Sequence, residues 1–125
     1  MTLKEEFDAV QKRISRVLTA LELARLEASQ QGERFFLAGI YVGIAYEAAF
    51  SAVKQLRDDT SKMVPPIASV DYESFEFYAK RLAGKKKLKI ESVCKSLLLV
   101  AQTLVGEAES HLGTAQFLML DLDEG

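Results

Sequence analysis

Cysteine, histidine, proline and tryptophan are scarce or missing in this sequence. It contains one Cys, one His, two Pro and no Trp among 125 residues. A single Cys excludes an internal disulfide framework and a cysteine-rich zinc site. Gly-rich phosphate loops, catalytic-triad spacings and paired acid–base signatures are missing too. We therefore expect a protein that is not an enzyme, with no catalytic residue and no cofactor.

A strong net charge is also missing. The chain has 16 Lys+Arg against 18 Asp+Glu, a net charge of −2, so it has no overall attraction to nucleic acid or to a membrane. Its 49% hydrophobic and 27% charged residues are ordinary for a soluble globular protein and exclude a wholly disordered chain. The length is that of one domain, residues 1–125, with enough chain to bury a core.

The first 31 residues predict a long amphipathic helix over 2–31. Thr2 and Glu5 match a capping box, in which each side chain pairs with a free backbone N–H of the first turn. Gly32 follows as a residue that adopts the left-handed conformation easily. Apolar residues recur in steps of four and three, as along a narrow packing seam: Leu3, Phe7, Val10, Ile14, Val17, Leu21, Ala24 and Ala28.

Residues 33–57 predict a second helix that is apolar nearly all round, as the most buried helix of a bundle would be. Its length approaches that of a membrane span, but we favour the central helix of a cytoplasmic bundle and expect no membrane contact. Gly39 and Gly43 predict a neighbouring helix at close approach. Glu47 is the only charge between Phe35 and Val53. It is a candidate buried charge, unless it faces a solvent gap or pairs with an arginine.

The rest of the chain predicts a second helical pair after a break. Residues 58–70 form a loop around Pro65 and Pro66, because proline cannot lie inside a helix. Helices are expected over 71–82 and 88–112, with Gly84 and Gly113 as their ends, and 113–125 form an apolar and then acidic tail. The expected fold is an all-α bundle of about four helices, in which 1–57 and 71–112 are the two halves.

Two residues carry reactive side chains. His111 lies four residues after Glu107, so the two share a helix face, but one such pair is a weak metal signature. We favour a histidine near a helix end and expect no metal. Cys94 lies on an apolar seam, where a free cysteine usually serves as a small core residue.

Two segments carry charge of one sign. A basic run holds seven cations and one acid, and it is a candidate RNA contact or else a solvated turn. Residues 96–125 hold five acids and no Lys or Arg. Within them, Phe117, Leu118, Met119 and Leu120 are a candidate partner-binding tail or else dock on their own bundle. In a homodimer, the basic turn of one chain can also face the acidic end of the other. The basic run consists of Lys80, Arg81, Lys85, Lys86, Lys87, Lys89 and Lys95.

The stretch Tyr46–Leu56 reads Tyr-Glu-Ala-Ala-Phe-Ser-Ala-Val-Lys-Gln-Leu. With the helix before it, over about residues 20–57, it resembles the central helix of HEPN-type bundles. The resemblance implies a dimeric helical bundle, in a family that includes RNases and partners of small nucleotidyltransferases in toxin–antitoxin systems. The RNase motif of that family is an Arg, four to six residues and a His. No Arg lies within twenty residues before His111, so the resemblance implies a non-catalytic member.

These patterns predict a non-catalytic interaction module, homodimeric and acting through a protein partner. The alternative is a small RNA-binding subunit of a ribonucleoprotein complex, which would use the basic run from Lys80 to Lys95.

Overall fold

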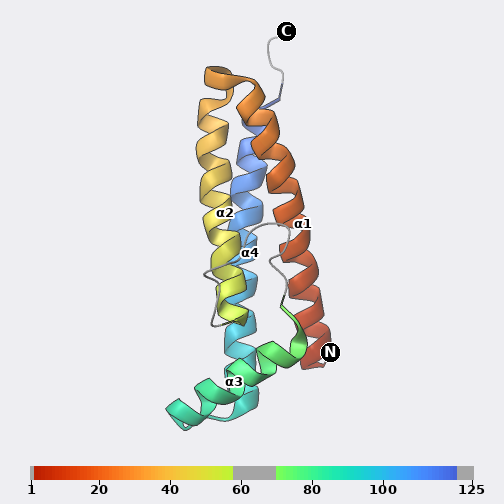
Figure 1. Cartoon of the computed structure of the whole chain (residues 1–125), viewed down its shortest axis with the longest axis vertical. Coiled ribbons are helices and arrows are strands. Elements are labelled where there is room, and N and C mark those ends of the chain that lie inside the picture. Colours follow the sequence, from red (N-terminus) through yellow and green to blue (C-terminus); the bar gives the residue numbers. More distant parts are fainter. Residues whose placement is uncertain (1, 58–69, 121–125) are drawn as a thin grey trace.

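The computed structural model describes residues 2–57 and 70–120, and these residues are helical with no strand. Three long helices, α1 (Leu3–Gln30), α2 (Phe36–Leu56) and α4 (Ile90–Leu118), lie side by side along the long axis (Figure 1). The short helix α3 (Tyr72–Lys86) lies across the lower end (Figure 1). The prediction of an all-α bundle of about four helices is confirmed.

The start of α1 confirms the predicted capping box. The backbone N–H of Glu5 donates to Thr2 Oγ1 at 3.2 Å, and the Thr2 N–H donates to Glu5 Oε1 at 3.4 Å. The predicted seam from Phe7 to Ala28 is buried, and Leu3 is half-buried. A turn of 3-10 helix, Gly32–Phe35, then reverses the chain, and Gly32 has the left-handed φ of +55° that glycine accepts at little cost.

The most extensive contact between helices joins α2 and α4, which run in opposite directions. On α2 the alanines repeat every seven residues, at Ala38, Ala45 and Ala52. Alanines at 101, 108 and 115 repeat in the same way on α4, and all six are at most 1% exposed. Because a methyl group is the only side chain at these positions, the two backbones can approach closely. A small-residue contact between helices is therefore present, but it is made by alanines.

Aromatic packing holds α3 at the lower end. The Phe7 ring of α1 meets Phe75 at 4.9 Å and Tyr72 at 5.5 Å between centroids, the latter edge to face. Asp71 caps α3 by accepting the Ser74 N–H at 2.6 Å. Hydrogen bonding to the Ser74 side chain, followed by the bond to its backbone, holds the pKa of the Asp71 carboxyl below its usual value.

The predicted ends of α3 and α4 are wrong. Gly84 stays helical, and α3 ends at Lys86, which is followed by Lys87 with a left-handed φ of 55°. The Leu88 N–H donates to the Ala83 carbonyl at 3.0 Å, which is the bond of a Schellman turn. Gly113 also stays helical, because Leu112 and residues beyond it still face the core, and α4 continues to Leu118.

The stripe that α4 buries differs in part from the predicted seam. Cys94, Ala101 and Ala108 are common to both, whereas Ile90 is exposed. Leu98, Val105 and Leu112 take the positions predicted for Leu97, Leu104 and His111, which are half-buried. Each of these three is displaced by one residue, because steps of four and three both fit an apolar stretch of helix.

Candidate interaction surfaces

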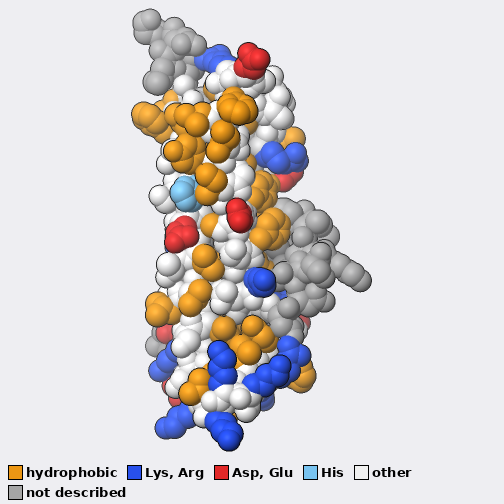
Figure 2. Space-filling view, turned by 90° about the vertical axis from the view of Figure 1, so that its left-hand side faces the viewer, with side chains coloured by type: hydrophobic (Ala, Val, Ile, Leu, Met, Phe, Trp, Pro, Cys, Tyr) orange, Lys and Arg blue, Asp and Glu red, His pale blue; other side chains and the backbone are white. Residues whose placement is uncertain are grey.

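The side of α2 turned away from the bundle is apolar and exposed, although α2 has the largest share of buried residues among the described helices, as predicted. Phe36 is 69% exposed, and Leu37, Ile40 and Ile44 are exposed as well. Figure 2 shows hydrophobic side chains gathered on the upper part of this side of the molecule. We call this surface the outer face of α2, and it consists of Phe36, Leu37, Gly39, Ile40, Gly43 and Ile44.

The two glycines of the outer face have no close neighbour. A Cβ added at Gly39 or Gly43 would meet no atom of the described residues within 4 Å outside its own helix. The predicted close approach of a neighbouring helix at these glycines is therefore wrong within the described protein. Beside them, a groove of about 360 Å³ separates α1 from α2, and Ala28, Phe36, Gly39 and Ile40 are among its lining residues.

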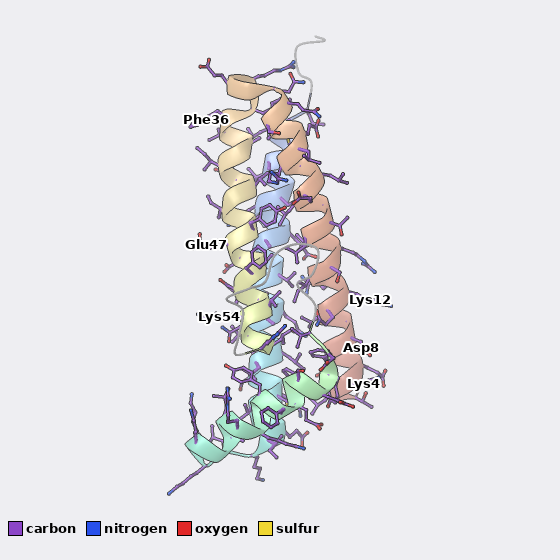
Figure 3. The ribbon with its side chains drawn as sticks, in the orientation of Figure 1. Lys4, Asp8, Lys12, Phe36, Glu47 and Lys54 are labelled. Carbon is purple, nitrogen blue, oxygen red and sulfur yellow. The ribbon has the colours of Figure 1, made fainter. Side chains whose placement is uncertain are left out.

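Glu47 lies on the same outer side of α2 and is exposed, so it is not a buried charge, and the alternative in which it faces solvent holds. It points away from the bundle, as Phe36 does (Figure 3). This exposure has a simple reason. The apolar stretch covers both sides of α2, and Glu47 lies on the side that no described helix covers.

One polar cluster ties α2 to α1 at the border of the outer face. The Tyr46 hydroxyl donates to Glu22, and Glu22 also pairs with Arg25. Burial and the nearby Glu22 carboxylate raise the pKa of Tyr46 to about 12. Arg25, followed by Tyr46, lowers the pKa of Glu22. The cluster fixes how α2 is rotated against α1, and so which residues the outer face presents.

All seven residues of the basic run are exposed at one end of the molecule, and we call them the basic end. Figure 2 shows cationic side chains gathered at the lower end, on the side that also carries the outer face of α2. Lys80 pairs with Glu76 at 3.5 Å and Lys95 with Glu91 at 3.2 Å, while Arg81 lies over the Tyr78 ring at 6.0 Å.

An apolar groove of about 220 Å³ opens between α3 and α4 at the basic end. We call it the α3–α4 groove. It is bordered by the Schellman turn at Lys87, and exposed Leu88 is part of its lining. The apolar residues of its lining are Leu82, Leu88, Val93 and Leu97, and the one cation of its lining is Lys86.

The candidate tail is divided between the core and the surface. Phe117 and Leu118 belong to the last turn of α4, where Leu118 is half-buried, and Met119 is buried. Phe117 and Leu120 are exposed. The tail therefore docks in part on its own bundle, through Leu118 and Met119. The acidic end of the tail, residues 121–125, lies outside the described residues, as do residues 58–69 of the loop predicted over 58–70.

Cys94 and His111 are integrated into the packing. Cys94 is 2% exposed, and burial raises the pKa of its thiol, which disfavours the reactive thiolate. His111 is half-buried beside the Tyr41 ring at 6.2 Å. It lies two turns before the end of α4, so the helix end predicted beside it is wrong. No cluster of three metal-ligand side chains occurs among the described residues.

No family model, curated protein or solved structure matches this chain.

One described helical stretch, Gly32–Leu56, is long and apolar enough to cross a membrane by length and composition, and a core helix can meet the same test. Only 33% of its most apolar window is buried.

The sequence contains a signal for the outer face that the predictions above do not use. Phe36, Ile40, Gly43 and Glu47 follow steps of four, three and four, while Ala38 and Ala45 begin a seven-residue repeat on the opposite side. Two such patterns on one helix predict two packing faces.

Proposed function

We propose that this chain is a non-catalytic helical interaction module that forms a homodimer through the outer face of α2. The proposal rests on one observation: four large apolar side chains and two glycines share one exposed surface of one helix. Apolar patches that stay exposed on a folded surface commonly mark an interaction site.

A second copy of the same face fits this surface in an antiparallel arrangement. When two α2 helices cross so that Ile40 of one lies over Gly43 of the other, Ile44 lies over Gly39. Each isoleucine then fills the space left by a glycine, and two-fold symmetry makes every contact occur twice. A parallel pair would instead place Glu47 against its own copy and bring the two basic ends together, and both contacts repel.

The resemblance to HEPN-type bundles supports the same proposal, because those bundles are dimers. In that family, non-catalytic members act beside other proteins, so the homodimer would present its remaining surfaces to a protein partner. We propose this role for a protein of the cytoplasm.

The test is the mass of the protein in solution, measured by sedimentation over a range of concentrations. We expect the parent protein to dimerise and Ile40→Asp to be monomeric, because a carboxylate cannot be buried unpaired in the contact. The matched control is Leu99→Asp, because Leu99 is 64% exposed but lies on α4. We expect this variant to dimerise as the parent does.

Two results would contradict the proposal. One is a parent protein that stays monomeric at tens of micromolar. The other is a dimer that Ile40→Asp leaves intact while circular dichroism shows both proteins folded. A monomer that binds lipid vesicles through the same face would assign the outer face to a membrane instead.

RNA binding at the basic end remains a second candidate function, favoured by seven exposed cations beside exposed Phe77. Other aromatic residues near the basic run are not free to stack on bases, because Phe75 is fully buried and Tyr72 packs on Phe7. Binding of single-stranded RNA that weakens steeply with salt, and that is lost when Lys85, Lys86, Lys87 and Lys89 are changed to Glu, would support it.

A further inference from the structure

We infer that residues 121–125 of one copy bind the α3–α4 groove of a second copy in the dimer. The inference rests on the proposed antiparallel homodimer and adds a second contact to it. Its starting point is a complementary pair of features: an apolar groove lined by Lys86 at the basic end, and a segment in which Leu122 lies among three acids.

The groove and the segment match in chemistry. Leu82, Leu88 and Val93 provide an apolar floor that a leucine side chain can enter. Lys86 lines the groove, and Lys85, Lys87 and Lys89 stand next to it in the chain, all exposed. The segment that follows exposed Leu120 reads Asp121-Leu122-Asp123-Glu124-Gly125, which sets carboxylates on both sides of its one apolar side chain.

The segment cannot reach the groove of its own chain. The groove lies at the beginning of α4 and the segment follows its end, and the 29 residues of α4 span about 43 Å at 1.5 Å each. Five extended residues reach about 18 Å at most. Residues 121–125 can therefore enter an α3–α4 groove only in another copy of the chain.

The antiparallel dimer places the segment and the groove at similar levels along the bundle axis. Tyr41 lies beside His111, so Leu120, nine residues further along α4, lies near the level of Gly32. With Ile40 over the partner's Gly43, that level falls beside the partner's Ser51. In the partner, Leu97 marks the near end of the groove and is level with Gln55. Gln55 lies four residues beyond Ser51, or about 6 Å along the axis.

The size of the α2 contact supports an additional one. The outer face offers six residues per copy, whereas a stable interface of standard size uses about 20–30 residues on each side. A tail bound in each of the two grooves would enlarge the contact symmetrically. It would also neutralise the basic end with charges that the chain itself carries.

The experiment is a charge exchange between the groove and the tail. The groove variant carries Lys86→Glu and Lys89→Glu, and the tail variant carries Asp121→Lys and Asp123→Lys. We expect each variant alone to dimerise about ten-fold more weakly than the parent at low salt, because its tail and grooves now repel. We expect an equal mixture to form a heterodimer of near-parental affinity, because both tail–groove pairs are then of opposite charge.

The matched control is Lys4→Glu with Lys12→Glu, which makes the same charge change on α1, where both side chains point away from the bundle (Figure 3). We expect it to leave the dimer unchanged. A mixture that does not restore affinity, or a groove variant that dimerises like the parent, would overturn the inference. If that groove variant instead loses binding to single-stranded RNA, the basic end is a nucleic-acid surface.

The two proposals fail in different ways. If Ile40→Asp abolishes the dimer and the charge exchange has no effect, the α2 contact stands and the tail contact is wrong. If the parent protein forms no dimer at all, the proposed function is wrong and the tail contact fails with it.

Discussion

The inner and outer faces of α2 both carry small residues at regular helical spacing, but only the inner face is covered by a described helix. Ala38, Ala45 and Ala52 face α4 and are at most 1% exposed. A Cβ added at Gly39 or Gly43, on the outer side, would meet no described atom within 4 Å outside its own helix. Alanine and glycine therefore have different structural effects on α2. Alanine permits a close contact within the bundle, whereas glycine leaves space on the surface of the bundle.

The comparison of the two faces predicts that a leucine placed on each of them changes the free energy of unfolding in opposite directions. Ala45→Leu inserts a large side chain into the α2–α4 contact, and we expect it to lower the free energy of unfolding by about 1–3 kcal/mol. Gly43→Leu places the same side chain on the open surface and removes a flexible helical glycine. We expect it to raise the free energy of unfolding of the monomer by up to about 1 kcal/mol.

Chemical denaturation of both variants, at concentrations where the protein is monomeric, measures this difference. The buried Cys94 provides a second readout, because its reaction with a thiol reagent requires opening of the bundle. We expect faster labelling in Ala45→Leu and slower labelling in Gly43→Leu than in the parent. Equal destabilisation by the two leucines would mean that both faces of α2 are covered.

The sequence allowed the fold class and α1 to be predicted because their signals are local. A capping box and a seam with one apolar side, from Phe7 to Ala28, specify both a helix and its buried face. In α2 the apolar residues surround the helix, so periodicity cannot tell which side meets α4. Whether Glu47 is buried depends on that choice, so the sequence left both alternatives open. The basic end could be located from composition alone, whereas the α3–α4 groove required the fold.

Helix ends were predicted poorly for a related reason: a glycine was treated as a stop. Gly84 and Gly113 are both helical, and the left-handed position at the end of α3 is occupied by Lys87. The position of a helix end depends on how far the buried face continues, and for α4 it continues to Ala115 and Met119. That information lies in the packing.

A pair of exchanges at the end of α3 tests this explanation with a smaller effect. Lys87→Gly removes the strain of a left-handed lysine, and Gly84→Ala places a better helix former where no described atom lies within 4 Å of the new methyl group. We expect each exchange to raise the free energy of unfolding by about 1 kcal/mol. The control variant, Lys87→Ala, should not raise the free energy of unfolding, because alanine also has a Cβ at this left-handed position. Destabilisation by Gly84→Ala would show that this glycine is needed where it stands.

The smallest expected effect concerns Tyr46, which stands at the border between the two faces of α2 and donates a hydrogen bond to Glu22 on α1. We expect Tyr46→Phe to cost about 0.5–1 kcal/mol at neutral pH, because it removes this bond and leaves the ring in place. The pKa of Tyr46 is raised from 10.0 to about 12 in the folded protein, so folding favours the protonated phenol. This contribution to stability is fully present below pH 10 and is lost as the pH rises through about 12.

Two measurements on Tyr46 follow from this shift. Spectrophotometric titration of the parent should show one tyrosine with a midpoint near pH 12 that is missing in Tyr46→Phe. Unfolding curves at increasing pH should show the two proteins converging in stability through the same window. If the stability difference instead grows with pH, the phenol is not held by Glu22, and the rotation of α2 that exposes Ile40 and Ile44 must be fixed by the alanine contact with α4 alone.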